Sequence, residues 1–112
     1  MSTLKTINLE FGRPTVEEAL KRFDIELKKA KKNDVGCLLI IHGYGSHGKG
    51  GLIRDALREK LGTLLNDKAI KTCIYGEDFK ILDKDANRLR HQYTELESLF
   101  HMTNKGVTVV EL

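Results

Sequence analysis

Apolar and polar positions follow several different spacings along the chain, and each spacing predicts a different element. Residues 5–11 alternate, which is typical of a strand that is buried on one face. One face of this strand would carry Ile7, Leu9 and Phe11, and the other would carry Asn8 and Glu10. We therefore expect an early half-buried strand with Phe11 on its inner face.

The next segment, from Thr15 to Lys32, has the spacing of an amphipathic helix. Its apolar residues recur every three or four positions, at Val16, Leu20, Phe23, Leu27 and Ala30. Thr15 and Glu18 form the pattern of a capping box, and Pro14 precedes it. The basic run KKAKK at 28–32 falls at the end of this helix, where cations complement the helix dipole. We interpret this run as a solvated helix end.

The rest of the chain alternates between predicted strands and predicted helices. A continuous apolar run with β-branched residues, Val35–Ile41, indicates a buried strand. The later elements are a helix over 52–65, a strand over 70–75, a more polar helix over 83–93, a short turn over 95–100 and a strand over 107–112. The βαβαβαβ order predicts an α/β fold whose buried strands are parallel. Ligands of such folds usually bind at the carboxyl ends of strands.

The composition is that of a globular protein with one domain. The chain has 112 residues, of which 40% are hydrophobic and 31% are charged. Its longest apolar run, Cys37–Ile41, is too short to span a bilayer, and its N-terminus has no signal-peptide pattern. We therefore expect a single domain over residues 1–112, located in the cytoplasm with no membrane partner. A monomer is the default, because no heptad pattern is present.

Charge and cysteine content narrow the function classes only slightly. The net charge of +3 permits nucleic-acid binding but does not demand it. Cys37 and Cys73 each lie in an apolar strand-like run, as expected of buried reduced thiols rather than of a disulfide. No histidine stands at close ligand spacing to either cysteine, so we expect neither a metal site nor a cofactor.

The stretch IIHGYGSHGKGG, residues 40–51, places five glycines between the end of a strand and the start of a helix. Gly43 and the pair Gly48-Lys49 have the spacing of a nucleotide-binding P-loop. However, Gly50 stands where a P-loop needs Ser or Thr for Mg²⁺, and the chain is too short for the sheet of a P-loop NTPase. Glycines that let a phosphodiester approach the N–H groups of a helix N-terminus explain the stretch better. A plain connecting turn is the remaining alternative, although it would not need the entropy cost of five glycines.

Three blocks of the sequence resemble the small MutS-related, or Smr, domain family. Residues 9–20, LEFGRPTVEEAL, resemble the family's first strand and capped helix, which typically begin Leu-Asp-x-His-Gly. Residues 38–57, LLIIHGYGSHGKGGLIRDAL, are similar to its His-Gly-x-Gly strand, loop and helix, and residues 106–112, GVTVVEL, are similar to its closing strand. From this resemblance we expect a free-standing, bacterial-type member of the family.

The resemblance implies a fold, a partner and a class of chemistry. The implied fold is a two-layer α/β sandwich with helices on one side of a mixed four-stranded sheet. The implied partner is nucleic acid, DNA or RNA, because Smr domains bind nucleic acid and several nick DNA or cleave RNA. The sequence departs from the family at Gly12, which replaces the motif's histidine, whereas Glu10 keeps its carboxylate. The loop is also longer, with residues 46–51 between the His-Gly-x-Gly core and the helix.

Candidate site residues follow from the loop and from the resemblance together. Phosphate contacts are expected from Gly43, Gly45, Gly48, Lys49 and Arg54, with Tyr44 either stacking on an unpaired base or packing over the loop's own glycines. His42 could act as a general acid or base, or could fix the loop by bonding to backbone. Glu10 could orient His42 or activate water, or could be a plain surface carboxylate. Glu77 and Asp78 would repel phosphate or hold a cation if they lie near the loop.

Three functions are open on this sequence. The first is a nucleic-acid-binding domain that uses the glycine loop as a phosphate-binding surface. The second is a metal-independent endonuclease in which Glu10 and His42 are catalytic, and the third is a protein-interaction module. The missing imidazole at Gly12 favours binding over cleavage. A phosphate binder should lose affinity steeply as salt rises, whereas an interaction module should not respond to nucleic acid at any salt concentration.

Overall fold

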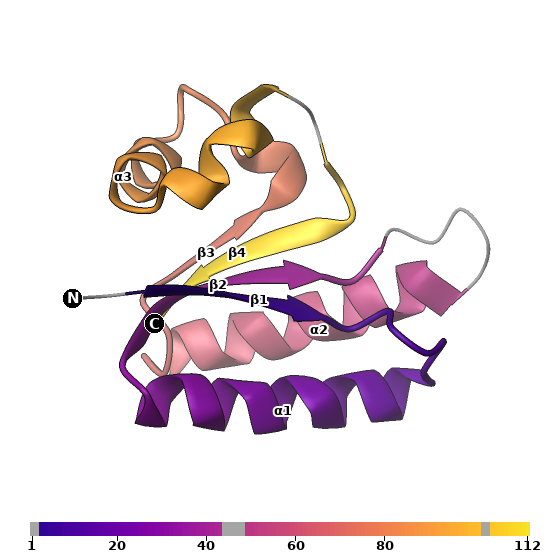
Figure 1. Cartoon of the computed structure of the whole chain (residues 1–112). Coiled ribbons are helices and arrows are strands. Elements are labelled where there is room, and N and C mark those ends of the chain that lie inside the picture. The colour runs from indigo at the N-terminus through magenta and orange to yellow at the C-terminus, as the bar shows by residue number, and fades with distance from the viewer. Residues whose placement is uncertain (1–2, 44–48, 102–103) are drawn as a thin grey trace.

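Four strands form one mixed sheet in a computed structural model that describes residues 3–43, 49–101 and 104–112. The sheet has the order β1-β2-β4-β3 (Figure 1). The strands are β1 (Thr3–Asn8), β2 (Val35–Ile41), β3 (Thr72–Tyr75) and β4 (Val107–Glu111). β1 runs parallel to β2, whereas β4 runs antiparallel to both of its neighbours. The mixed sheet is confirmed, but the two central strands are antiparallel rather than parallel, because β4 enters the sheet from the opposite end.

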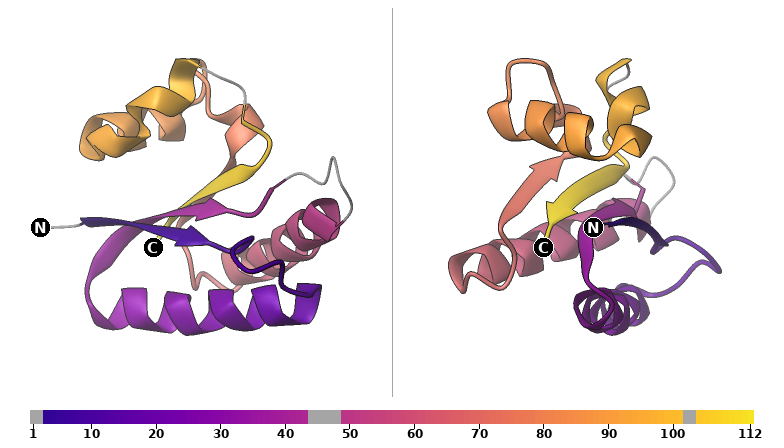
Figure 2. Two further views of the ribbon diagram at one scale, coloured as in Figure 1. Left: turned by 45° about the vertical axis from the view of Figure 1, so that its right-hand side comes forward. Right: turned by 60° about the vertical axis from the view of Figure 1, so that its left-hand side comes forward.

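Helical segments cover both faces of the sheet (Figures 1 and 2). The two long helices, α1 (Val16–Lys32) and α2 (Lys49–Asn66), lie on one face. The other face is covered by α3 (Lys84–Gln92) and the 3-10 segment η2 (Thr94–His101), while the short η1 (Gly76–Asp78) directly follows β3. The α/β class is confirmed, and the expectation of helices on one side holds for the long helices alone. The central strands are apolar on both faces, which requires cover on both.

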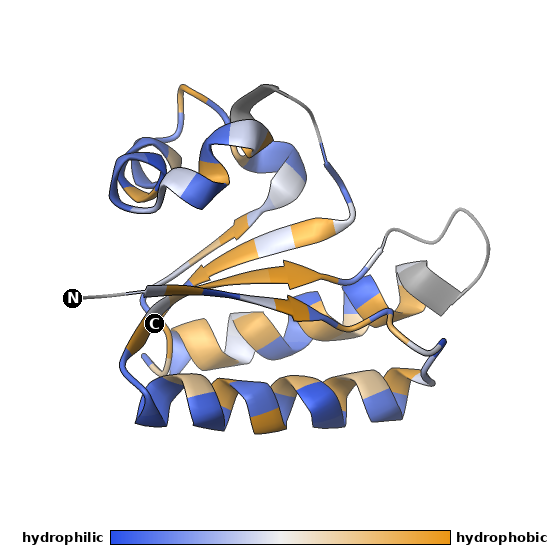
Figure 3. Ribbon diagram, in the orientation of Figure 1, coloured by the Kyte–Doolittle hydropathy of each residue, from blue (hydrophilic) through white to orange (hydrophobic). Residues whose placement is uncertain are grey.

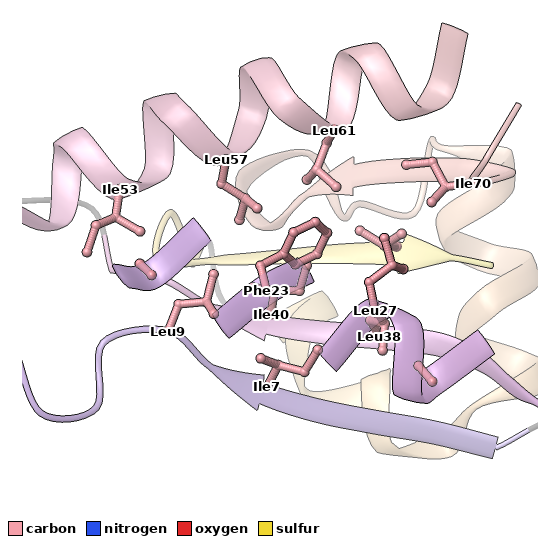
Figure 4. Close-up of a cluster of buried hydrophobic side chains, with 13 residues drawn as sticks. Ile7, Leu9, Phe23, Leu27, Leu38, Ile40, Ile53, Leu57, Leu61 and Ile70 are labelled. Atoms are coloured by element: carbon pink, nitrogen blue, oxygen red, sulfur yellow. The ribbon is translucent and has the colours of Figure 1, made fainter. Parts of the chain in front are cut away.

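Each face of the sheet has its own hydrophobic core. The first core lies between the sheet and the long helices (Figure 4), and its largest members are Ile7, Leu9, Phe23, Leu27, Leu38, Ile40, Ile53, Leu57, Leu61 and Ile70. The second core joins strand residues to α3 and η2, and it comprises Cys37, Ile74, Phe79, Ala86, Leu89, Tyr93, Leu96, Leu99, Val107 and Val109. In Figure 3, which is coloured by hydropathy, the central strands are apolar and α1 turns polar residues outward.

α1 begins and ends where the sequence predicts. Thr15 Oγ1 accepts a hydrogen bond from the N–H of Glu18, and Glu18 Oε1 accepts one from the N–H of Thr15, both at 3.1 Å. This is the predicted capping box. The last turn carries Lys29, Lys31 and Lys32, all exposed, so the basic run is a solvated helix end as interpreted.

The first strand is shorter than predicted, and Phe11 is not in the core. Ile7 and Leu9 are buried as expected, but the side chain of Phe11 is 75% exposed. β1 ends at Asn8, and the chain then turns through Gly12, with φ +82°, and Arg13, with φ +51°. Alternation predicts burial only while the backbone stays extended, so the prediction for Phe11 is wrong.

The cysteines are free, as the sequence predicts, and burial raises the pKa of Cys37 to about 12 and that of Cys73 to about 11. Within residues 3–43, 49–101 and 104–112, no three His, Cys, Asp or Glu side chains gather as metal ligands would. No helix in the same ranges is long and apolar enough to cross a membrane.

Candidate functional site

One end of the sheet brings together the segments that carry the predicted site residues. β1, β2 and β3 end there, and β4 begins there because it runs antiparallel. α2 begins at the same end (right-hand side of Figure 1 and of the left view in Figure 2). The N–H of Leu9 donates to the carbonyl of Ile41 at 2.7 Å, and the N–H groups of His42 and Gly43 donate to the carbonyl of Gly106 at 2.9 and 3.0 Å. These bonds fix the position from which the glycine loop leaves β2.

Glu10 lies directly against Gly43 at the root of the loop. A Cβ atom on Gly43 would stand 1.8 Å from Glu10 Oε1 and 2.7 Å from its Cδ. Gly43 also has φ +75°, in the left-handed region that favours glycine. Backbone conformation and the nearby carboxylate therefore both require glycine at this position. The structure brings Glu10 to the loop, although it does so from the turn after β1 rather than from the strand itself.

His42 is fully buried at the end of β2, and both of its ring nitrogens have partners within the protein. Nδ1 lies 2.6 Å from the carbonyl oxygen of Gly43, and Nε2 lies 2.9 Å from Thr108 Oγ1. Because a carbonyl oxygen only accepts, Nδ1 carries the proton and the Thr108 hydroxyl donates to Nε2. Burial lowers the pKa of His42, and the guanidinium groups of Arg58 and Arg54 act in the same direction, which favours this neutral ring.

The sequence allows two roles for His42, and its geometry supports the role of fixing the loop. The ring joins the carbonyl of Gly43 to Thr108 on β4, the strand that pairs with β2. In this arrangement no ring nitrogen is available to a substrate. The catalytic role stays a prediction, and it requires the bond from Thr108 to break.

Arg58 on α2 lies between Glu77 and the ring of Tyr75. Its Nη2 donates to both carboxylate oxygens of Glu77, at 2.7 and 2.8 Å, and its guanidinium carbon is 3.8 Å from the centroid of the Tyr75 ring. Burial alone would raise the pKa of Glu77, but hydrogen bonding and charge from Arg58 outweigh it and hold this pKa below its usual value. Glu77 thus holds a cation, which was one of the two expectations for it, and that cation belongs to the chain itself.

Arg54 lies one helical turn before Arg58, near the start of α2. In the part of the chain that the structure describes, its ionic partner is the neighbouring Asp55, with Nε and Oδ1 3.4 Å apart. That distance is long for a charge-assisted hydrogen bond. The first turn of α2 contains no acidic residue, whereas α1 begins with Glu17 and Glu18. The positive end of the α2 dipole therefore has no acidic side chain in its own first turn.

Part of the predicted site lies outside the described residues. This applies to Tyr44, Gly45 and Gly48, whose predicted contacts stay predictions, and of Lys49 the structure gives only its place as the first residue of α2. The structure brings Glu10, His42, Gly43 and Arg54 to one end of the sheet, and adds Arg58, Tyr75 and Thr108, which the sequence did not indicate. Arg58 could have been found from its four-residue spacing to Arg54, which puts both on one helix face.

Comparison with known proteins identifies the family. A family model described as the Smr domain matches residues 11–74, which is more than half of the chain. The chain belongs to the Smr domain family. Among solved structures, this Smr domain is similar to the one in the crystal structure of the Smr domain of Thermus thermophilus MutS2, with a TM-score of 0.59, 26% sequence identity and 96% of each chain covered. No protein with curated annotation matched it.

Membership confirms the resemblance that the three sequence blocks indicated. The matched region begins at Phe11, after Glu10, and includes the whole glycine loop, all of α2 and most of β3. Smr domains are known in general for nucleic-acid binding and nicking. Nucleic acid is thus the general class of partner for the family, and what this Smr domain itself does is argued from its own geometry.

Proposed function

We propose that this Smr domain binds nucleic acid through the end of the sheet where the glycine loop leaves β2. The observation that supports this most directly is the charge arrangement at the start of α2. Its first turn has no acidic residue, and Arg54 follows one turn later with a weak ionic partner. N–H groups at a helix start beside a cation form an anion-binding site, and the phosphodiester is the anion that nucleic acid supplies.

The carboxylate of Glu10 decides which part of the loop meets phosphate. It occupies the space beside Gly43, so a phosphate that approached Gly43 would face a negative charge. Phosphate contacts are therefore expected from Gly45, Gly48, Lys49 and Arg54 rather than from Gly43. Gly43 contributes by letting Glu10 pack against the loop root. The charge of Arg58 is matched by Glu77, so we do not count it among the phosphate contacts.

Cleavage is the second candidate function, and one observation favours it. Glu10 contacts Gly43, the residue after His42, so the two predicted catalytic side chains lie at the same loop root. The exposed carboxylate of Glu10 could activate a water molecule. His42 is less suited to catalysis, because Gly43 and Thr108 occupy both of its nitrogens. We therefore rank binding above cleavage.

Binding and cleavage can be scored in one experiment. The purified protein is incubated with supercoiled plasmid and with labelled single-stranded RNA, beside Glu10→Gln and His42→Ala variants. We expect retarded complexes that dissociate as salt rises, with both substrates intact. Nicking that disappears in Glu10→Gln would establish the nuclease instead. The absence of any complex with either nucleic acid would refute the proposal and leave the protein-interaction module.

A further inference from the structure

Phe11 places an exposed aromatic ring beside the proposed phosphate-binding surface. Among the large apolar side chains that are exposed in the described part of the chain, Phe11 is the aromatic one, and 75% of its surface is accessible. The preceding residue, Glu10, touches Gly43. Consecutive Cα atoms are about 3.8 Å apart, so the backbone of Phe11 lies next to the residue that contacts the loop root.

The turn that carries Phe11 is held by several hydrogen bonds. Arg22 Nη1 donates to the carbonyl of Phe11 at 2.9 Å and to that of Asn8 at 3.3 Å, and the N–H of Arg13 donates to the carbonyl of Glu10 at 3.1 Å. Arg13 has φ +51°, a conformation that side-chain-bearing residues adopt only under constraint. Such backbone strain concentrates at ligand-binding segments. The hydrogen bonds hold the backbone of the turn at Phe11 in place.

The turn after β1 leaves the ring of Phe11 in solvent. Its place in the alternating pattern would have put it in the core beside Leu9, and an exposed ring forgoes that burial. Another apolar side chain, Leu52, is 61% exposed on the first turns of α2. Leu9, two residues before Phe11, and Ile53, next to Leu52, pack at the same end of the first core (Figure 4).

Phe11 has charges of both signs near it in the chain, since the carboxylate of Glu10 precedes it and lies against Gly43, while Arg13 is exposed two residues later. An exposed ring near an exposed cation suits a ligand that is apolar and anionic at once. A nucleic-acid strand has this combination, because flat bases alternate with charged phosphates along it. Aromatic rings bind bases by stacking whatever the sequence, provided that the base is unpaired.

We propose that Phe11 is a stacking platform for an unpaired base, so that this Smr domain binds single strands in preference to continuous duplex. The inference rests on the proposed function, to which it adds a base contact beside the phosphate contacts. In a duplex the flat faces of the bases are covered by their neighbours, and the ring could reach one only after unstacking. Stacking uses no sugar hydroxyl, so single-stranded DNA and single-stranded RNA both qualify.

The absence of tryptophan from the chain makes a direct test possible. Phe11→Trp places one indole at the proposed platform, and Leu82→Trp places one at a side chain that is 93% exposed in the connection between η1 and α3. Titration with a single-stranded oligonucleotide, as DNA and as RNA, should quench the fluorescence of Phe11→Trp and leave that of Leu82→Trp nearly unchanged. An abasic oligonucleotide of the same length should not quench Phe11→Trp. Equal quenching of the two variants, or quenching by the abasic strand, would overturn the inference.

Affinities separate this inference from the proposed function. Phe11→Ala should weaken single-strand binding about 5- to 100-fold, keep its salt dependence and leave duplex binding unchanged. The control Ile25→Ala, at an exposed apolar site on α1, should change neither single-strand binding nor duplex binding. If Phe11→Ala binds single strands as the unaltered protein does, or weakens duplex and single strand alike, the stacking platform fails while the phosphate surface stands. If the unaltered protein binds no nucleic acid, both proposals fail.

Discussion

Replacing Gly43 by alanine should destabilise the fold through two effects that can be separated. Alanine would have to adopt φ +75° at this position, and its Cβ would stand 1.8 Å from Glu10 Oε1. The first effect belongs to the backbone of the loop root, and the second to the packing of Glu10 on it. The substitution therefore tests whether Glu10 occupies the place on which both the binding and the cleavage hypotheses depend.

The size of each effect follows from the geometry. A left-handed conformation costs alanine ~1–2 kcal/mol, and the reduced entropy of the unfolded chain offsets ~0.4–1 kcal/mol of this. Only the tip of Glu10 clashes, since its Cγ would stand at an ordinary 3.4 Å. Moving a flexible tip away from its rotamer adds ~0.5–1.5 kcal/mol. The expected net loss in the free energy of unfolding is ~1–2 kcal/mol.

Gly12 supplies the matched control, because it has φ +82° and a Cβ there would meet nothing within 4 Å. Gly12→Ala therefore carries the backbone effect alone. Urea unfolding should show a loss for Gly43→Ala that exceeds the loss for Gly12→Ala by ~0.5–1.5 kcal/mol, and this excess should disappear when Glu10 is also replaced by alanine. Equal losses for the two glycines, or an excess that survives Glu10→Ala, would refute the contact.

Three further predictions concern other parts of the account, and urea unfolding measures each of them. Gly76→Ala should cost ~3 kcal/mol or more, because its Cβ would stand 2.0 Å from a backbone carbonyl oxygen. Its control is Gly62→Ala, in open space on α2, which should stabilise by ~1 kcal/mol. Similar effects of the two substitutions would contradict the close packing around Gly76. The pKa of His42 lies below its ordinary 6.5, so the unfolded chain takes up that proton first and stability should fall as pH drops through 6.5. His42→Gln should flatten that fall, and an unchanged pH profile would contradict the burial of a neutral ring. Arg58→Lys should cost ~1–2 kcal/mol, because lysine cannot both pair with Glu77 and stack as a planar group; no loss would mean that the pair is not formed.

Elements with local signals were predictable to the residue. α1 carries its own start signal in Thr15 and Glu18, and its apolar face is set by spacing within the helix. The strand Val35–Ile41 was predicted with the bounds that the structure shows, because it is a continuous apolar run bounded by polar residues and glycine. In both elements the deciding contacts lie within a few residues of one another.

Features set by contacts between distant segments were not predictable. The pattern could not show that β1 stops at Asn8, because a turn held by Arg22 from α1 redirects the chain before Phe11. The partner of His42 Nε2 is Thr108, which is 66 residues away in sequence. A signal for the second helical layer did exist: strands that are apolar on both faces need cover on both. The sequence thus predicted that Glu10 and His42 would meet at the strand ends, as they do in the structure, while the bonds around them depended on the tertiary structure.

The salt dependence of nucleic-acid binding tests the central claim most directly. Affinity for a labelled single strand is measured over a range of salt concentrations for the unaltered protein, for Arg54→Gln and for Lys32→Gln, which removes the same charge at the far end of α1. Each phosphate contact contributes about 0.7 to the logarithmic salt slope on single strands. The account predicts that Arg54→Gln lowers the slope by about this amount and that Lys32→Gln leaves it unchanged. A slope that Arg54→Gln does not alter, or that both variants lower equally, would contradict the placement of the phosphate-binding surface at the start of α2.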